Sequence, residues 1–130
     1  MTVNKERVEL LAQALESGDY QQCTGRLRHW YYEENEEEGD RILYSYCAEG
    51  VAVQVALDND AKLRKAWSTK NWWNPHPTKV IKEWYGFPVL QYIRIDMGGG
   101  SCALAIANDD GTDFWTIAQA LRATYLKEEG

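Results

Sequence analysis

The stretch RILYSYCAEGVAVQVALD, Arg41 to Asp58, decides the fold because it joins an alternating segment directly to an apolar run. The large residues of its first half share one face of a strand with a period of two: Ile42, Tyr44 and Tyr46. Residues 48–57 fit a strand through alternate valines and also fit a helical stripe, and periodicity alone does not decide so short a run. We favour a helix that begins where the strand ends.

An acidic segment precedes this strand. The residues EENEEEGD, 33–40, separate it from an upstream segment, CTGRLRHWYY, that is also rich in aromatic residues. Two such segments joined by a short polar connection predict an antiparallel β-hairpin. Six of the eight connecting residues are acids, whose mutual repulsion predicts a solvated tip: Glu33, Glu34, Glu36, Glu37, Glu38 and Asp40.

Helical patterns occupy both ends of the chain. Thr2 is a candidate cap for a helix over 3–17, and the apolar stripe of this helix is Val8, Leu11, Ala12 and Leu15. Thr112 or Asp113 can cap a final helix, in which the stripe is Ile117, Ala118, Leu121 and Tyr125. Pro77 and Gly86 bracket a shorter helix, with one face formed by Val80, Ile81 and Trp84.

A second hairpin is expected after the short helix. VLQYIRIDM (89–97) alternates as a strand, GGGS (98–101) permits the positive φ angles of a turn, and CALAIA (102–107) can return as the partner strand. The whole pattern predicts an α+β fold. We expect one compact domain, residues 1–130, in which two antiparallel β-hairpins, forming one sheet or two, pack with about four helices.

A basic segment interrupts an acidic chain. The net charge is −6, yet residues 61–82 contain six cations and no acid, which leaves 8 bases against 20 acids elsewhere. The Asn, Pro and Ser content predicts a long irregular connection after one more helical turn. Adjacent Trp72 and Trp73 would point to opposite sides of an extended chain, which exposes one of them. The alternative is that Trp67 and Trp84 anchor the core while the lysines are only solvated. The candidate binding residues are Lys62, Arg64, Lys65, Lys70, Trp72 and Trp73.

Composition limits the class of protein. With 130 residues, 45% of them hydrophobic, the chain has the size and composition of one soluble globular domain. It lacks the apolar stretch of a signal peptide and any run near the roughly 20 residues of a membrane span. Its cysteines have neither disulfide-framework nor zinc-site spacing: Cys23, Cys47 and Cys102. We expect a cytoplasmic protein with reduced thiols and no membrane contact.

The motifs predict no catalytic site, metal or cofactor. A nucleophilic Cys47 would need a neighbouring cation, histidine or helix N-terminus, and His29 could approach it across the hairpin. A free cysteine in an apolar context is more often buried, so we expect Cys47 to fill space where strand meets helix. The two histidines are far apart in sequence, NDDGTD lacks calcium-loop spacing, and GGGS lacks the lysine of a P-loop.

Several short motifs, taken in order, resemble a family of small, mostly uncharacterised proteins of bacteriophages and prophages. An SG-x-Y-x-Q segment and the glycine and leucine after it are matched by Ser17, Gly18, Tyr20, Gln22, Gly25 and Leu27. A YC-x-x-GV motif is matched by Tyr46, Cys47, Gly50 and Val51. A V-x-x-W-x-G segment is matched by Val80 or Ile81, Trp84 and Gly86. An LND-x-G-x-x-F-x-x-IA ending is matched by Asn108, Asp109, Gly111, Phe114, Ile117 and Ala118.

The resemblance spans most of the chain and also favours the helix over 48–57. It implies a phage-encoded accessory protein in the cytoplasm of a bacterial host. We expect a non-enzymatic binding protein that engages a host protein, for example to counter a defence system. Two alternatives stay open: binding of nucleotides or single-stranded nucleic acid by segment 62–82, and mimicry of nucleic-acid phosphates by the acidic tip 33–40. A cysteine-dependent enzyme with Cys47 as nucleophile is a fourth hypothesis.

Overall fold

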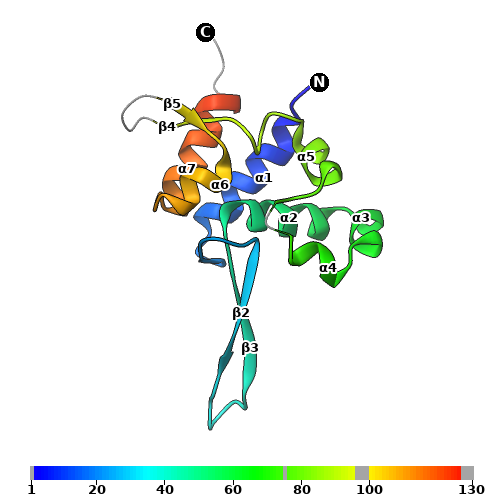
Figure 1. Ribbon diagram of the computed structural model, residues 1–130, viewed down its shortest axis with the longest axis vertical. Coiled ribbons are helices and arrows are strands. Elements are labelled where there is room, and N and C mark those ends of the chain that lie inside the picture. Colours follow the sequence, from blue (N-terminus) through cyan, green and yellow to red (C-terminus); the bar gives the residue numbers. More distant parts are fainter. Residues whose placement is uncertain (1, 75, 96–99, 127–130) are drawn as a thin grey trace.

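A helical body and a long two-stranded ribbon make up the molecule (Figure 1). The computed structural model describes residues 2–74, 76–95 and 100–126. Within these ranges it contains seven α-helices and two small β-sheets, which confirms the α+β class. None of the helices in the described ranges combines the length and apolar character that a membrane crossing requires.

The three longest helices lie at the centre of the body, where α1 (Lys5–Glu16) packs against both α2 (Ala48–Asn59) and α7 (Phe114–Leu121). The predicted stripe of α1 is buried. The predicted cap is wrong, because the side chain of Asn4 rather than Thr2 accepts the N–H of Arg7, at 3.1 Å. Asp113 caps α7 by accepting the N–H of Thr116 at 2.8 Å, which selects one of the two predicted caps.

Helix α2 resolves the ambiguity of the opening stretch in favour of a helix. Nine of its twelve residues are buried, and this burial around the whole circumference explains why valines alternate without an exposed face. The backbone at Leu27 passes close to the first turn of α2, because a Cβ added to Gly50 would lie 1.7 Å from the carbonyl oxygen of Leu27. Gly50 is therefore required for the body and the base of the ribbon to approach each other.

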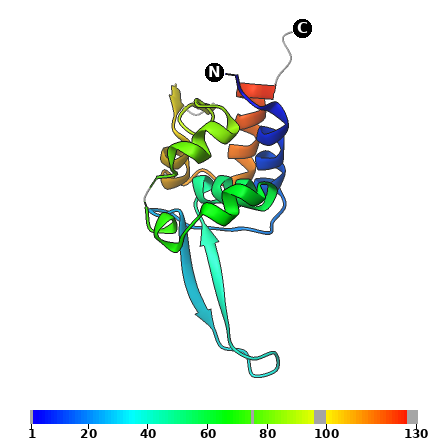
Figure 2. The same cartoon turned by 90° about the vertical axis from the view of Figure 1, so that its right-hand side faces the viewer.

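The ribbon is the first predicted hairpin. Strands β2 (Arg28–Glu33) and β3 (Arg41–Tyr46) pair in an antiparallel arrangement, and the acidic tip connects them. A two-residue strand, β1 (Gln21–Gln22), adds a parallel pairing to the end of β3, which the sequence did not indicate. Contrary to the expected packing against helices, most of the ribbon projects away from the body (Figure 2). The described chain begins and ends on the opposite side of the body (Figure 1).

The second hairpin is much shorter than predicted. Strands β4 (Ile93–Ile95) and β5 (Gly100–Cys102) pair in an antiparallel arrangement and form a separate sheet. Residues 96–99, which cover the end of the predicted strand and the start of the predicted turn, lie outside the described part. The predicted return strand over 102–107 is wrong beyond Cys102, because Leu104–Asp109 form helix α6. As a helix this run buries residues three and four positions apart: Leu104, Ala107 and Asn108.

The basic segment is less irregular than predicted. It forms two short helices, α3 (Ala61–Ala66) and α4 (Thr69–Trp72), before α5 (Lys79–Tyr85). Asp60 accounts for the first of them, because its side chain accepts the N–H of Leu63 at 3.0 Å and caps α3. Helix α5 lies where predicted, but Val80 is exposed, and the buried residues are Ile81, Trp84 and Tyr85.

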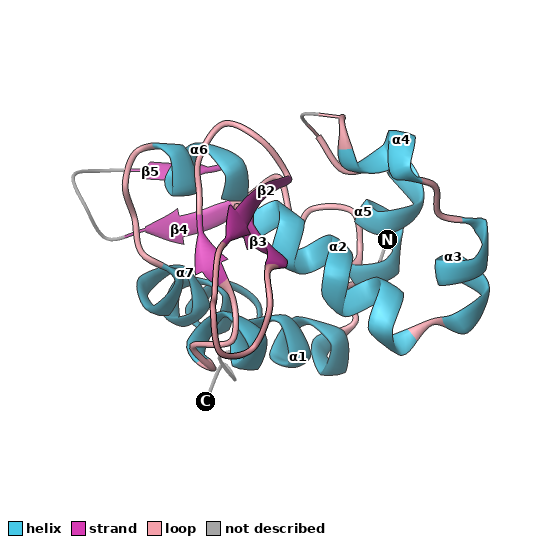
Figure 3. Ribbon diagram, turned by 90° about the horizontal axis from the view of Figure 1, so that it is seen from below, coloured by secondary structure: helices cyan, strands magenta, loops and turns pink. Residues whose placement is uncertain are grey.

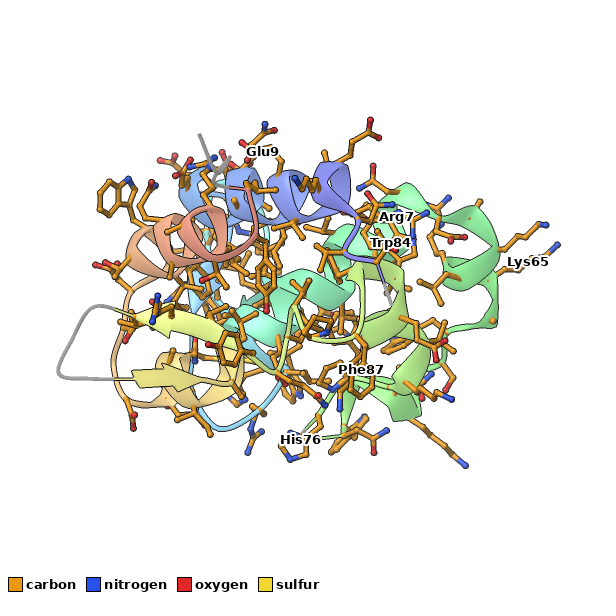
Figure 4. The ribbon with its side chains drawn as sticks, turned by 90° about the horizontal axis from the view of Figure 1, so that it is seen from above. Arg7, Glu9, Lys65, His76, Trp84 and Phe87 are labelled. Atoms are coloured by element: carbon orange, nitrogen blue, oxygen red, sulfur yellow. The ribbon has the colours of Figure 1, made fainter. Side chains whose placement is uncertain are left out.

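Trp84 anchors α5 to the first helix. The guanidinium of Arg7 lies 4.2 Å from the centre of the Trp84 ring, and its Nη1 donates a hydrogen bond to the Trp84 carbonyl at 2.8 Å. Figure 4 shows the two residues side by side. The ring of Tyr85 meets Trp84 edge to face at 4.8 Å. A helix of seven residues has little stability alone, so these contacts hold α5 in place.

Replacing Trp84 should therefore destabilise the fold, whereas replacing Trp73 should not. Trp84 is 8% exposed and Trp73 is 81% exposed. Trp84→Ala should lower the free energy of unfolding by about 3–5 kcal/mol, because it leaves a cavity. Trp73→Ala, at the surface, should change it by less than about 1 kcal/mol. Urea denaturation measures both variants, and a wild-type midpoint for Trp84→Ala would contradict this packing.

Candidate functional site

One face of the ribbon is an exposed apolar surface, which we call the aromatic face: Trp30, Tyr32, Ile42 and Tyr44. Trp30 pairs with Tyr44 and Tyr32 pairs with Ile42, and paired residues of antiparallel strands point to the same side. Each of the four side chains is between 42% and 57% exposed. Contiguous exposed apolar surface of this kind is typical of an interaction site.

The tip of the ribbon carries uncompensated negative charge. Glu33 forms an ion pair with Arg41 at 3.5 Å, and Asp40 accepts a hydrogen bond from the hydroxyl of Tyr32 at 2.5 Å. The other acids of the tip form no ion pair with the residues that the structure describes: Glu34, Glu36, Glu37 and Glu38. The aromatic face therefore ends in an acidic tip.

A pocket of about 430 Å³ lies at the base of the ribbon, between β2, β3 and α4. Figure 3 shows the ribbon end-on, with the helices of the body around it. The cationic and imidazole side chains that line the pocket come from the base of the ribbon: Arg26, Arg28 and His29. The aromatic side chains come from both sides: Trp30, Tyr44, Trp72 and Trp73. No carboxylate is among the described residues that line this pocket.

Arg28 is held in the pocket between two aromatic rings. Its guanidinium carbon lies 4.3 Å from the ring centre of Tyr44 and 4.2 Å from that of Trp72. Trp72 is itself fixed, because it is 9% exposed and meets the rings of Tyr46 and Trp67 edge to face at 6.1 and 6.0 Å. Stacking uses the faces of a guanidinium and leaves its in-plane N–H groups for a ligand.

The structure joins two of the six predicted binding residues to this pocket and leaves four outside. Trp72 and Trp73 line it, one buried and one exposed as predicted, although at the end of a helix rather than in an extended chain. The predicted cations do not line it: Lys62, Arg64, Lys65 and Lys70. Lys65 points outward on α3 (Figure 4). The arginines of the pocket, Arg26 and Arg28, come from the first half of the hairpin, which the sequence did not indicate as a binding segment.

Cys47 has the corner position that the sequence predicts. It is buried and caps α2, with its sulfur accepting the N–H of Gly50 at 3.3 Å. Burial raises the pKa of the Cys47 thiol to about 12, so the thiol stays protonated at neutral pH. His29, the histidine that could have approached Cys47, lies at the pocket, where its Nδ1 accepts a hydrogen bond from Arg26 at 3.2 Å. This environment does not favour a nucleophilic thiolate.

Glu49 is a buried acid that the sequence analysis did not single out. Burial raises its pKa from 4.5 to about 7, while Lys82 opposes and Asp109 adds to the shift. Its Oε2 has no hydrogen-bond partner among the described residues. Among the residues that the structure describes, no three His, Cys, Asp or Glu side chains come together as a metal site. The buried Glu49 carboxylate destabilises the fold when it is charged, and Glu49 does not line the pocket.

Neutralising Glu49 should stabilise the protein at high pH only. Its folded pKa lies above its unfolded value, so stability falls as pH rises from 4.5 to about 7 and then stays low. At pH 8, Glu49→Gln should gain on the order of 3 kcal/mol, with no difference below the unfolded pKa. Glu6→Gln, also in the first turn of its helix but exposed, is the control and should change little. Urea denaturation across pH tests this, and a Gln variant less stable at pH 8 would contradict it.

Comparison of the chain with protein-family models, with curated proteins and with solved structures found no match. The resemblance to phage and prophage proteins therefore stays a prediction. What supports a function is the arrangement of the aromatic face, the acidic tip and the pocket.

Proposed function

We propose that this chain is a non-enzymatic binding protein that engages another protein through its ribbon. The observation that carries the proposal is the exposed aromatic face on a projecting element. These side chains contribute little to the core, because they remain about half exposed. Burying them against a partner would remove their apolar surface from water, which favours association.

The partner should present a basic surface beside an apolar groove. The acidic tip lies at the end of the ribbon, so a basic surface would attract it and orient the ribbon before contact. The outer edge of β2 has no neighbouring strand among the described residues, and it can add to a strand of the partner. Charge, apolar contact and strand pairing would then act together along one element.

The resemblance to phage proteins suggests where this partner is found. It leads us to propose a bacterial host protein, which includes the components of defence systems. The buried, protonated Cys47 supports binding over cysteine chemistry. The acids of the tip serve in this proposal to steer a protein–protein contact, and the aromatic face supplies most of its stability.

Removing part of the aromatic face should weaken partner capture. The variant Tyr32→Ser/Ile42→Ser removes one cross-strand pair of the face and should weaken binding by roughly tenfold or more, as expected for interface anchors. Neutralising Glu36, Glu37 and Glu38 with Gln should also weaken it and reduce its salt dependence. The measurement is quantitative mass spectrometry of proteins captured from a nuclease-treated bacterial lysate.

The matched control replaces two exposed apolar residues outside the ribbon, Val80→Ser/Ile106→Ser, and should leave capture unchanged. A tag on the N-terminal side avoids interference, since the described chain begins away from the ribbon (Figure 1). Circular dichroism confirms that each variant is folded. Equal capture by the wild type and the Tyr32/Ile42 variant would contradict the proposal, as would capture that disappears after nuclease treatment.

A further inference from the structure

We propose that the pocket at the base of the ribbon binds a nucleotide, with its base stacked on Trp73 and its phosphate held by Arg26 and Arg28. This pocket shares Trp30 and Tyr44 with the aromatic face, but the residues proposed to bind the base and the phosphate lie outside that face. Its ligand chemistry is a planar aromatic base joined to a phosphate. Free nucleotides and nucleotide units of a single strand share this chemistry.

The charge of the pocket is opposite to that of the molecule. The chain has a net charge of −6, yet two arginines and a histidine line this pocket, and no described carboxylate does. Neither Arg26 nor Arg28 forms an ion pair with another described residue. Two cations that line one pocket without a counter-ion attract an anion into it. The pocket therefore selects a negatively charged group.

The aromatic side chains select the other half of the ligand. Trp73 is 81% exposed at the pocket, so its ring faces are accessible, whereas Trp72 is packed beneath Arg28. An accessible indole binds a planar base by stacking, with little dependence on which base it is. The nearby guanidinium of Arg28 is already oriented by its two rings, which lowers the entropy cost of fixing a phosphate.

The dimensions agree with a single nucleotide. The volume of about 430 Å³ falls within the range of roughly 300–1,000 Å³ that is usual for small-molecule sites. The hydroxyl of Thr69, also at the pocket, offers a hydrogen bond to a sugar or base. The predicted lysines of α3 contribute nothing to this site, which distinguishes it from binding along the basic segment.

Nuclear magnetic resonance of the six tryptophan indole N–H groups tests the site directly. At about 50 mM salt, AMP or a short oligothymidylate should shift the signals of Trp30, Trp72 and Trp73, and about 200 mM salt should weaken the effect. Adenosine and inorganic phosphate, which each supply half of the ligand, should bind at least roughly fivefold more weakly. The signals of Trp84 and Trp115 should not move, because neither residue lines the pocket.

Matched variants separate the pocket from other surfaces. Trp73→Ala and Arg26→Gln should weaken AMP binding at least roughly fivefold, whereas Trp115→Ala and Lys65→Gln, also exposed, should not. Preference for AMP or for the oligonucleotide identifies the source of the ligand and supports the site in either case. The proposal is overturned if neither ligand shifts the three signals, or if Lys65→Gln abolishes binding while Trp73→Ala and Arg26→Gln retain it.

Discussion

The amide of Asn108 is the interaction on which the arrangement of this molecule depends. Asn108 is fully buried at the end of α6, and its Oδ1 accepts hydrogen bonds from Gln22 Nε2 at 2.8 Å and from the N–H of Ala48 at 3.0 Å. Its Nδ2 donates to the carbonyl of Cys23 at 2.7 Å. One side chain thus joins the segments that lead into and out of the ribbon, and any substitution would leave buried polar groups without partners.

This junction divides the molecule into two parts with different physical roles. In the body, α2 is buried nearly all round, and tight contacts such as that of Gly50 with Leu27 leave no room for change. In the ribbon, backbone pairing keeps the strands together while the side chains of the aromatic face stay exposed. The pocket lies where the two parts meet, so Trp72, which is packed in the body, holds Arg28 of the ribbon in place.

Local patterns in the sequence predicted most of the elements and the pairing of the first hairpin, but not the contacts between elements that are distant in the sequence. Alternation at Ile42 and Tyr44 identified β3, and helical spacing identified α1, α5 and α7. The strand predicted over residues 102–107 was wrong because a short apolar run fits the period of a strand and that of a helix. The structure has a helix there, which buries Leu104 and Asn108. The pocket was half predicted: the adjacent tryptophans stood out, but Arg26 and Arg28 meet them only through tertiary packing. The alternation of Arg28, Trp30 and Tyr32 was the one pattern in the sequence that could have placed Arg28 beside the aromatic residues of the ribbon.

The central claim is that the body folds independently of an exposed ribbon that serves binding. Replacing residues 32–42 with Asn-Gly would join Tyr31 to Leu43, which are already paired across the strands, by a two-residue turn. The direct measurement is the free energy of unfolding of this shortened chain in urea. We predict a value within about 1 kcal/mol of the full chain, because the removed residues are mostly exposed. A loss of more than about 3 kcal/mol would contradict the claim, since losses of that size come from disrupting buried packing.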